Sequence, residues 1–132
     1  MANPTFHNYA SAEAQSIAMH YSQAVILPGG TIKTSGQGGW DSNGSVANSA
    51  SEQVDLAFKN VDKALQAVDS RLSWKNVYAV RSYHINIDET AELVIAKLKS
   101  EMGDRRPIWT CVEVSKLGIE GMVVEIEVEA AL

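Results

Sequence analysis

The sequence has little cysteine, little positive charge and no long apolar run. Cys111 is its single cysteine, which excludes an intramolecular disulfide and a cysteine-rich zinc module. The 11 lysines and arginines are outnumbered by 16 acidic residues, and this balance argues against nucleic acid as a partner. The longest purely apolar runs, such as Ala24–Leu27, are far below the ~18 residues of a membrane span, so no membrane partner is expected.

Targeting and metal-binding signals are also missing. Residues 1–23 contain no lysine, no arginine and no apolar core of a signal peptide, which favours a cytoplasmic protein. His7 and His20 lack metal-ligand spacing with a carboxylate, so we expect no metal. The length suits one domain over residues 1–132, with a loose N-terminal arm over residues 1–18. We assign no role to residues 131–132, which are compatible with a vector-derived end.

The pattern of apolar residues predicts five strands and two helices. Strands are expected over residues 23–27, 31–35, 74–87, 109–114 and 122–128, and helices over residues 49–68 and 88–102. Ser49 and Glu52 form a capping-box pattern, Asp88 is the expected cap of the second helix, and Gly103 follows that helix. The order β-β-α-β-α-β-β predicts an α+β fold, a mixed sheet with both helices on one face.

The last predicted strand alternates strictly between apolar and acidic residues. Val124, Ile126 and Val128 point to one face, and the other face carries the carboxylates of Glu125, Glu127 and Glu129. The first face should pack under the helices. The acidic face is either solvated or lines a cleft between subunits, because fully buried carboxylates need partners.

Several short stretches together resemble the Rid family, also called the YjgF or L-PSP endoribonuclease family. They occur in family order and are Tyr21-Ser22-Gln23-Ala24, Thr34-Ser35-Gly36-Gln37, Gln53 with Ala57, Asn60-Val61, Ala64-Leu65, Pro107, Thr110-Cys111-Val112-Glu113-Val114, Leu117 and Val124-Glu125-Ile126-Glu127. The resemblance implies a chorismate-mutase-like (YjgF-like) fold, assembled as a homotrimer around a central barrel. It also implies hydrolysis of 2-imino and enamine acids in clefts between subunits, without a metal or organic cofactor.

The resemblance also implies the site residues. Glu125 would position water, and Tyr21 and Cys111 would complete the cleft together with the segment Ser35-Gly36-Gln37. The arginine with which such members hold the substrate carboxylate is absent, because Trp109 stands at its position. Tryptophan offers one neutral donor and a flat apolar surface, whereas arginine makes two charge-assisted hydrogen bonds.

Other residues leave alternatives open. Arg105 and Arg106 could swing into the cleft, or they could serve only solvation and charge compensation at the preceding helix end. Trp40, in the long loop over residues 36–51, could be an aromatic wall of a lid or pack on the surface. His84 could face the cleft or solvent. Cys111 is either a nucleophile or, as its apolar strand favours, a small buried residue.

The substitution of arginine by Trp109 directs the functional hypothesis. We expect a small-molecule enzyme of the Rid type whose imine, enamine or carbonyl substrate is aromatic or lacks a free carboxylate. Glu125 would act as general base, with Tyr21 as donor. The alternatives are a non-catalytic, ligand-binding or chaperone-like scaffold, the usual 2-imino acid deaminase and an endoribonuclease.

Overall fold

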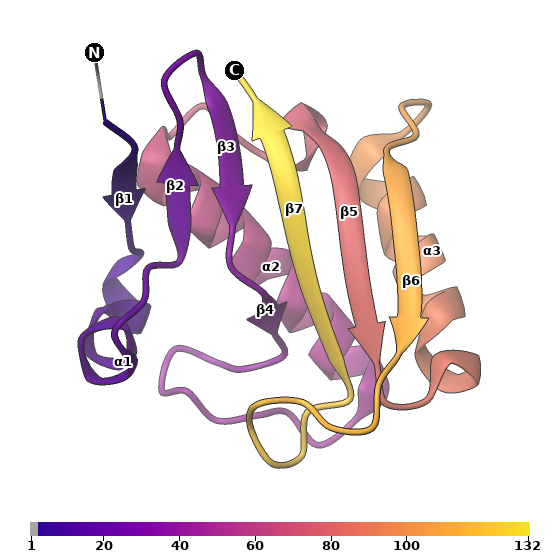
Figure 1. Cartoon of the computed structure of the whole chain (residues 1–132). Coiled ribbons are helices and arrows are strands. Elements are labelled where there is room, and N and C mark those ends of the chain that lie inside the picture. Colours follow the sequence, from indigo (N-terminus) through magenta and orange to yellow (C-terminus); the bar gives the residue numbers. More distant parts are fainter. Residues whose placement is uncertain (1–2) are drawn as a thin grey trace.

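The computed structural model describes residues 3–132 and is built on one seven-stranded sheet (Figure 1). The strands are β1 Thr5–His7, β2 Ala24–Ile26, β3 Thr31–Thr34, β4 Gln37–Gly38, β5 Val77–His84, β6 Ile108–Glu113 and β7 Val124–Ala131. Their order is β1-β2-β3-β7-β5-β6, and β4 also pairs with β7. Only β5 and β6 run parallel, so the sheet is mixed, as expected.

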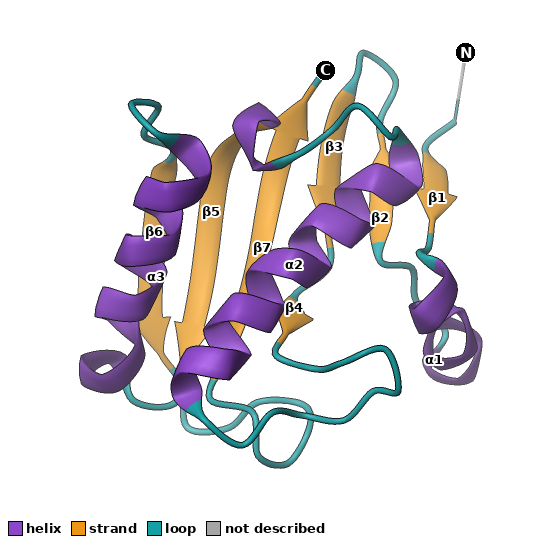
Figure 2. Cartoon of the chain, turned by 180° about the vertical axis from the view of Figure 1, so that it is seen from behind, coloured by secondary structure: helices purple, strands orange, loops and turns teal. Residues whose placement is uncertain are grey.

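The helices are α1 Glu13–Met19, α2 Ala50–Val68 and α3 Ile87–Met102, with short 3-10 turns at Ala10–Ala12 and Trp74–Asn76. The two long helices, α2 and α3, cover the same face of the sheet (Figure 2), which confirms the predicted α+β layering. Among residues 3–132 no helix is long and apolar enough to cross a membrane.

The prediction of a loose arm over residues 1–18 is wrong for the part that the structure describes, since β1 and α1 lie there. A buried hydrogen-bond network fixes this segment. The Tyr9 hydroxyl donates to Gln37 Oε1 at 2.8 Å, and Gln37 Nε2 donates to Gln23 Oε1 at 2.7 Å. Asn8 accepts from the Ser16 hydroxyl at 2.8 Å. The sequence is polar here because its polar groups bond one another across 7 to 28 residues, a pairing that local patterns do not reveal.

Helix ends follow the expected chemistry, with one shift. The Ser49 side chain accepts from the Glu52 backbone N–H, as predicted, and α2 begins at the next residue. The cap of α3 is Asn86, which accepts from the N–H of Asp88, so Asp88 lies in the first turn and is not the cap. The predicted strand over residues 74–87 starts later, at Val77, because Ser73 caps a 3-10 turn.

The core lies between the sheet and the two long helices. Val124, Ile126 and Val128 of β7 are buried under α2, as the alternation predicted. Phe58 of α2 stacks on Trp74 with ring centroids 4.3 Å apart, and Trp74 Nε1 donates to the Phe58 carbonyl at 3.0 Å. Every second residue of β7 therefore faces away from the helices, toward the outer face of the sheet.

Asp62 of α2 is an exception to the good pairing of the core. Its Oδ1 is buried without a hydrogen-bond partner among residues 3–132. Burial, helped by repulsion from Glu101, raises the pKa of this carboxyl from 3.8 to about 6. The folded state therefore binds the proton more tightly than the unfolded state, so the charged form destabilises the fold above about pH 6 and the effect disappears below about pH 4.

We predict that Asp62→Asn raises the free energy of unfolding at pH 7.5 by about 1–2 kcal/mol, a value discounted for the half-buried position of the carboxyl. The gain should shrink to near zero at pH 3, where the carboxyl is protonated in both the folded and the unfolded state of the wild type. Urea unfolding at the two pH values measures it. Asp104→Asn, at an exposed loop residue, is the control and should change little at either pH. An equal gain at pH 3 and pH 7.5 would contradict the prediction.

Candidate functional site

The outer face of β7 carries the three predicted carboxylates, and two of them are neutralised within the chain. Arg81 of β5 pairs with Glu127 at 3.2 Å and with Glu129 at 3.1 Å. Lys33 approaches Glu129 at 3.8 Å. The hydroxyls of two tyrosines also donate to this pair of carboxylates, Tyr83 to Glu127 and Tyr78 to Glu129. These two glutamates are therefore structural.

Glu125 differs from its two neighbours on β7. Among residues 3–132 it makes no ion pair, and it is half-buried. Burial raises the pKa of the Glu125 carboxyl above its ordinary value, and repulsion from Glu127 raises it further. A carboxylate that is desolvated and not paired with a cation is a better proton acceptor than an ordinary glutamate, which is what general-base chemistry requires.

Gly36 lies directly against the Glu125 carboxylate. A Cβ atom at Gly36 would lie 2.4 Å from Glu125 Oε1, closer than any real contact allows. The absence of a side chain at Gly36 therefore leaves the space that the carboxylate occupies. The predicted proximity of the Ser-Gly-Gln segment to the late glutamate is present within one chain.

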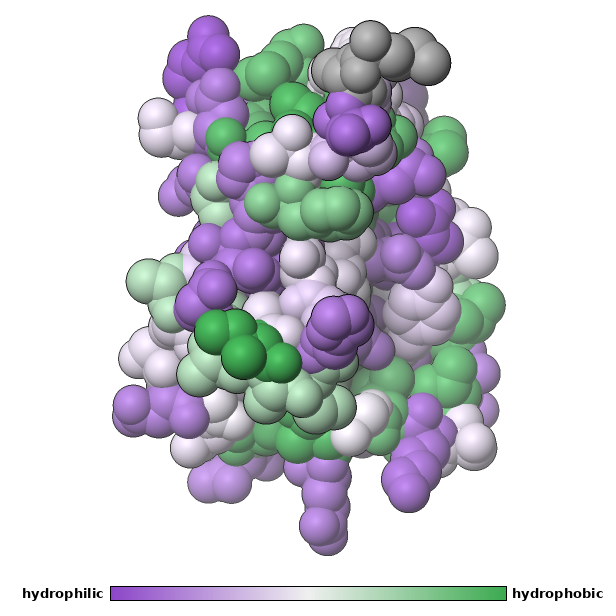
Figure 3. Space-filling model, turned by 60° about the vertical axis from the view of Figure 1, so that its left-hand side comes forward, coloured by the Kyte–Doolittle hydropathy of each residue, from purple (hydrophilic) through white to green (hydrophobic). Residues whose placement is uncertain are grey.

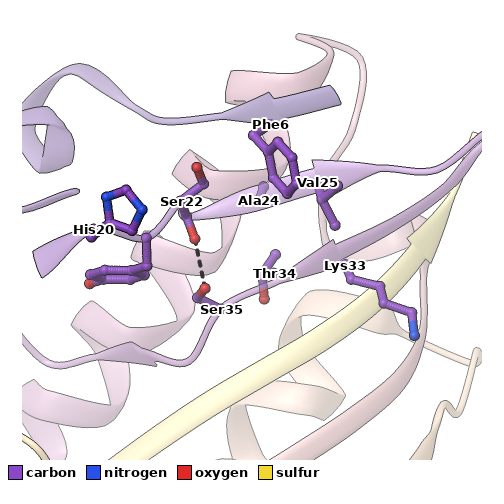
Figure 4. Close-up of a pocket in the computed structure, with 9 residues that line it drawn as sticks. Phe6, His20, Ser22, Ala24, Val25, Lys33, Thr34 and Ser35 are labelled. Carbon is purple, nitrogen blue, oxygen red and sulfur yellow. Dashed lines mark hydrogen bonds between the residues drawn. The ribbon is translucent and has the colours of Figure 1, made fainter. Parts of the chain in front are cut away.

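A hollow of about 450 Å3 opens beside this segment, and Tyr21 and Ser35 line it. Figure 4 shows its other walls, which include Phe6, Val25 and Lys33. The Ser35 hydroxyl donates to the Ser22 carbonyl at 2.7 Å, which ties the two sides of the hollow together. Ser35 of this hollow is followed in the chain by Gly36, which lies against the Glu125 carboxylate.

Apolar side chains reach the surface next to the hollow, on the side of β1 and α1 (Figure 3). Phe6 is 65% exposed, and Ile17 and Met19 of α1 are exposed to a similar degree. An apolar rim of this kind around a hollow is typical of a surface that receives a ligand or another protein chain.

Two predicted site residues belong to the interior instead. The side chain of Gln37 is fully buried, and both of its polar atoms are used in the network with Tyr9 and Gln23. Trp40 is buried, and its Nε1 donates to the Tyr9 hydroxyl at 3.3 Å. The indole is therefore neither the wall of a lid nor a surface tryptophan, because it closes the core beside Gly38.

Trp109 and Cys111 lie on the other face of the sheet. In the parallel register of β5 and β6 they stand beside Val80 and Ser82, whose side chains face the helices. Trp109 Nε1 donates to the Ser82 hydroxyl at 2.9 Å. Within one chain, the structure therefore separates Trp109 and Cys111 from Glu125 by the thickness of the sheet.

His84 continues the chain of hydrogen bonds from Trp109, and it is fully buried, facing neither solvent nor the hollow. The Thr90 hydroxyl donates to the Asn86 carbonyl, so it accepts from His84 Nδ1. His84 Nε2 then accepts from the Ser82 hydroxyl at 2.7 Å. Each hydrogen-bond donor in this chain has an acceptor only if the His84 imidazole is neutral. Burial lowers the pKa of His84, which also favours the neutral imidazole.

This role of Ser82, His84 and Thr90 was not predicted from the sequence. A usable signal exists, because Val80, Ser82 and His84 share one face of β5 and Val80 is apolar. Their period of two indicates a buried polar pair. The partner, Thr90, lies on α3 and becomes a neighbour only in the folded chain.

Arg105 and Arg106 lie at the edge of the sheet, where they line one hollow with Tyr78 and Ile108 and a second with Trp109. Together with Lys99 and Leu98 of α3 they line a groove of about 260 Å3 next to the indole. Both arginines are exposed, and Glu125 is not among the residues that line this groove. Among residues 3–132, no three side chains of the kinds that bind metal ions come close enough to hold one.

Comparisons with known proteins agree with the fold. The family model described as endoribonuclease L-PSP matches residues 12–132. Among solved structures, a protein described as YJGH has a TM-score of 0.86 and 25% identity, covering 99% of this chain and 98% of its own. The yeast protein YEO7_yeast has a TM-score of 0.83 and 25% identity, with 98% of both chains covered.

A third solved structure carries the Rid name. YyfA from Yersinia pestis is described as a protein of unknown function of the conserved Rid protein family, and it matches with a TM-score of 0.75 and 27% identity. The match covers 85% of this chain and 87% of that one. No curated protein matches the sequence. Because the family model spans nearly the whole chain and the neighbours share its fold, the protein belongs to the Rid, or endoribonuclease L-PSP, family.

Proposed function

We propose that the protein is a Rid-type small-molecule enzyme that hydrolyses an imine, or a related enamine or carbonyl compound, with Glu125 as general base. The observation that carries this proposal is the state of Glu125. Its carboxylate is half-buried, forms no ion pair among the described residues and lies against Gly36, and burial raises its pKa. Family membership by itself supports a deaminase-like or endoribonuclease-like role and no finer assignment.

The proposed reaction needs only water and proton transfers. Glu125 takes a proton from a water molecule as the oxygen of that water bonds to the carbon of the C=N group. The proton then passes to the nitrogen. The C–N bond then breaks as the proton of the new hydroxyl group passes through the Glu125 carboxylate to the nitrogen, which leaves a carbonyl compound and a free amine or ammonia. Backbone N–H groups near Gly36 and the hydroxyl of Tyr21 would stabilise the charge that develops.

We further propose that the complete site is shared between copies of the chain in a homotrimer. The proposed base, Glu125, and its neighbour Gly36 lie on the outer face, as do Tyr21 and Ser35. Trp109 and Cys111 lie on the helix side of the edge strand β6. One chain cannot bring the two together, but the edge of a second chain can. Trp109 would then add a flat apolar wall, which favours an aromatic substrate or one without a free carboxylate.

A comparison of two substrates tests the proposed chemistry. An aryl imine, followed by its ultraviolet absorbance, should be hydrolysed faster by the wild type than a 2-imino acid generated in the cuvette. Trp109→Arg should reverse this preference, because a guanidinium holds a carboxylate through two hydrogen bonds. No acceleration of either substrate over buffer by the wild type would overturn the proposed function.

A mixing experiment tests the shared site separately. The wild type lacks the arginine, and the double variant Trp109→Arg/Glu125→Gln lacks the base, so neither should hydrolyse 2-imino acids alone. When the two are unfolded together and refolded in equal amounts, about a quarter of the clefts should combine an intact Glu125 with the introduced arginine. Activity that stays absent in the mixture, while Trp109→Arg alone is active, would show that each site belongs to one chain.

A non-catalytic role is the alternative that Trp109 favours, because it replaces the arginine that would hold the substrate carboxylate. It predicts binding of apolar compounds with no effect of Glu125→Ala on any hydrolysis rate. An endoribonuclease function is disfavoured by the net charge of -5.

A further inference from the structure

The groove between α3 and β6 has apolar walls. It lies at the edge of the sheet, since β6 has no strand beyond it, and α3 runs alongside β6 (Figure 2). Leu98, Pro107 and Trp109 line it. The single polar atom of the indole is already bonded to the Ser82 hydroxyl at 2.9 Å, so Trp109 offers the groove only its apolar ring.

The rim of the same groove is positively charged. Lys99, Arg105 and Arg106 line it, and no acidic residue does. Within residues 3–132 none of the three forms an ion pair, whereas Lys97, two positions before Lys99, contacts both Asp55 and Glu101. Three cations without partners around one apolar groove are unusual in a chain whose net charge is -5.

From this combination we infer that the groove binds a small amphipathic carboxylate, an anion with an aromatic or branched apolar body. The apolar body would lie against Trp109 and Leu98, and the carboxylate would meet the guanidinium groups of Arg105 and Arg106. The planar fork of arginine matches a carboxylate with two parallel hydrogen bonds. A volume of about 260 Å3 is below that of pockets for drug-sized ligands, so the ligand is a small acid.

This site shares the ring of Trp109 with the proposed hydrolytic cleft, but it does not use Glu125. It needs residues of one chain only, and Glu125 lies on the opposite face of the sheet. Glu125→Gln should therefore abolish hydrolysis and leave binding in the groove unchanged. Loss of one property without the other distinguishes failure of this inference from failure of the proposed function.

Fluorine NMR titration with 4-fluorophenylacetate tests the inference on the full chain. The acid should bind at least tenfold more tightly than its neutral amide, and an equal concentration of acetate should not displace it. Arg105→Gln/Arg106→Gln should weaken binding about tenfold or more, and both side chains are exposed, so the fold should persist. Lys99→Gln should weaken binding by a smaller factor.

Two variants serve as controls. Lys59→Gln/Lys116→Gln removes two exposed charges elsewhere and should change the affinity less than twofold. Lys33→Gln removes the cation of the hollow on the outer face and should also have no effect. Equal binding of acid and amide, loss of binding in Lys33→Gln, or full binding in the double arginine variant would each overturn the inference.

Discussion

Replacing Glu125 with glutamine is expected to lower kcat/KM for the aryl imine by two to four powers of ten, the usual contribution of a general base. Glutamine keeps the size of the side chain but cannot accept the proton of the attacking water. The fold should not suffer, because the substitution removes a carboxylate whose charged form is disfavoured by burial. The melting temperature of the variant should therefore equal or exceed that of the wild type.

The pH dependence gives the same prediction a second readout. Glu125 is an active base only when it has lost its proton, so kcat/KM of the wild type should rise with pH through a pKa above the ordinary range of glutamate. Glu127→Gln removes the repulsion that helps to raise this pKa and frees Arg81, so the rise should move to lower pH. Glu120→Gln, in the bend before β7, is the control and should leave both rate and profile unchanged.

Retention of more than a third of the wild-type kcat/KM by Glu125→Gln would contradict a base role for this residue. If kcat/KM of Glu127→Gln rises at the same pH as that of the wild type, the titrating group is not Glu125. Both results are independent of protein yield, because they compare properly folded enzymes of known concentration.

Gly39→Ala is expected to produce the largest loss of stability, about 3 kcal/mol. A Cβ atom at Gly39 would lie 2.3 Å from the Cα atom of Gln53, in the first turn of α2. The helix backbone cannot yield locally, because the Gln53 side chain is bonded to the carbonyls of Ala47 and Gly121 and accepts from the N–H of Val123. The whole first turn must shift, and three hydrogen bonds move with it.

Denaturant unfolding with a constant m value measures this effect. Gly118→Ala is a matched control, because a Cβ atom there would meet no atom within 4 Å, and it should stay within about 0.5 kcal/mol of the wild type. A loss below about 1 kcal/mol in Gly39→Ala would show that the loop and α2 can separate at little cost. The close packing of the loop on the helix, and with it the fixed position of Gly36 and Glu125, would then be in doubt.

The candidate site was only partly predictable from the sequence. Tyr21, Ser35, Gly36 and Glu125 were predicted to share a site; the structure places Tyr21 and Ser35 at one hollow and Gly36 against Glu125, and the shared site stays a prediction. Trp40 was assigned to a loop rich in glycine and serine, where nothing local indicates that its indole reaches the Tyr9 hydroxyl. The same holds for the N-terminal segment, whose order depends on hydrogen bonds between residues far apart in the chain.

By itself, the sequence determined the α+β class, the N-terminal cap of α2 and the two faces of β7. These follow from local rules, since helix capping and the period of two in a strand involve residues a few positions apart. Only the tertiary structure decided that Arg81 neutralises Glu127 and Glu129 but leaves Glu125 without an ion pair among residues 3–132, and that Trp109 lies across the sheet from Glu125. The physical reason is that strand pairing joins β5, β6 and β7 in an order that differs from the chain, and charge pairing and burial depend on that order.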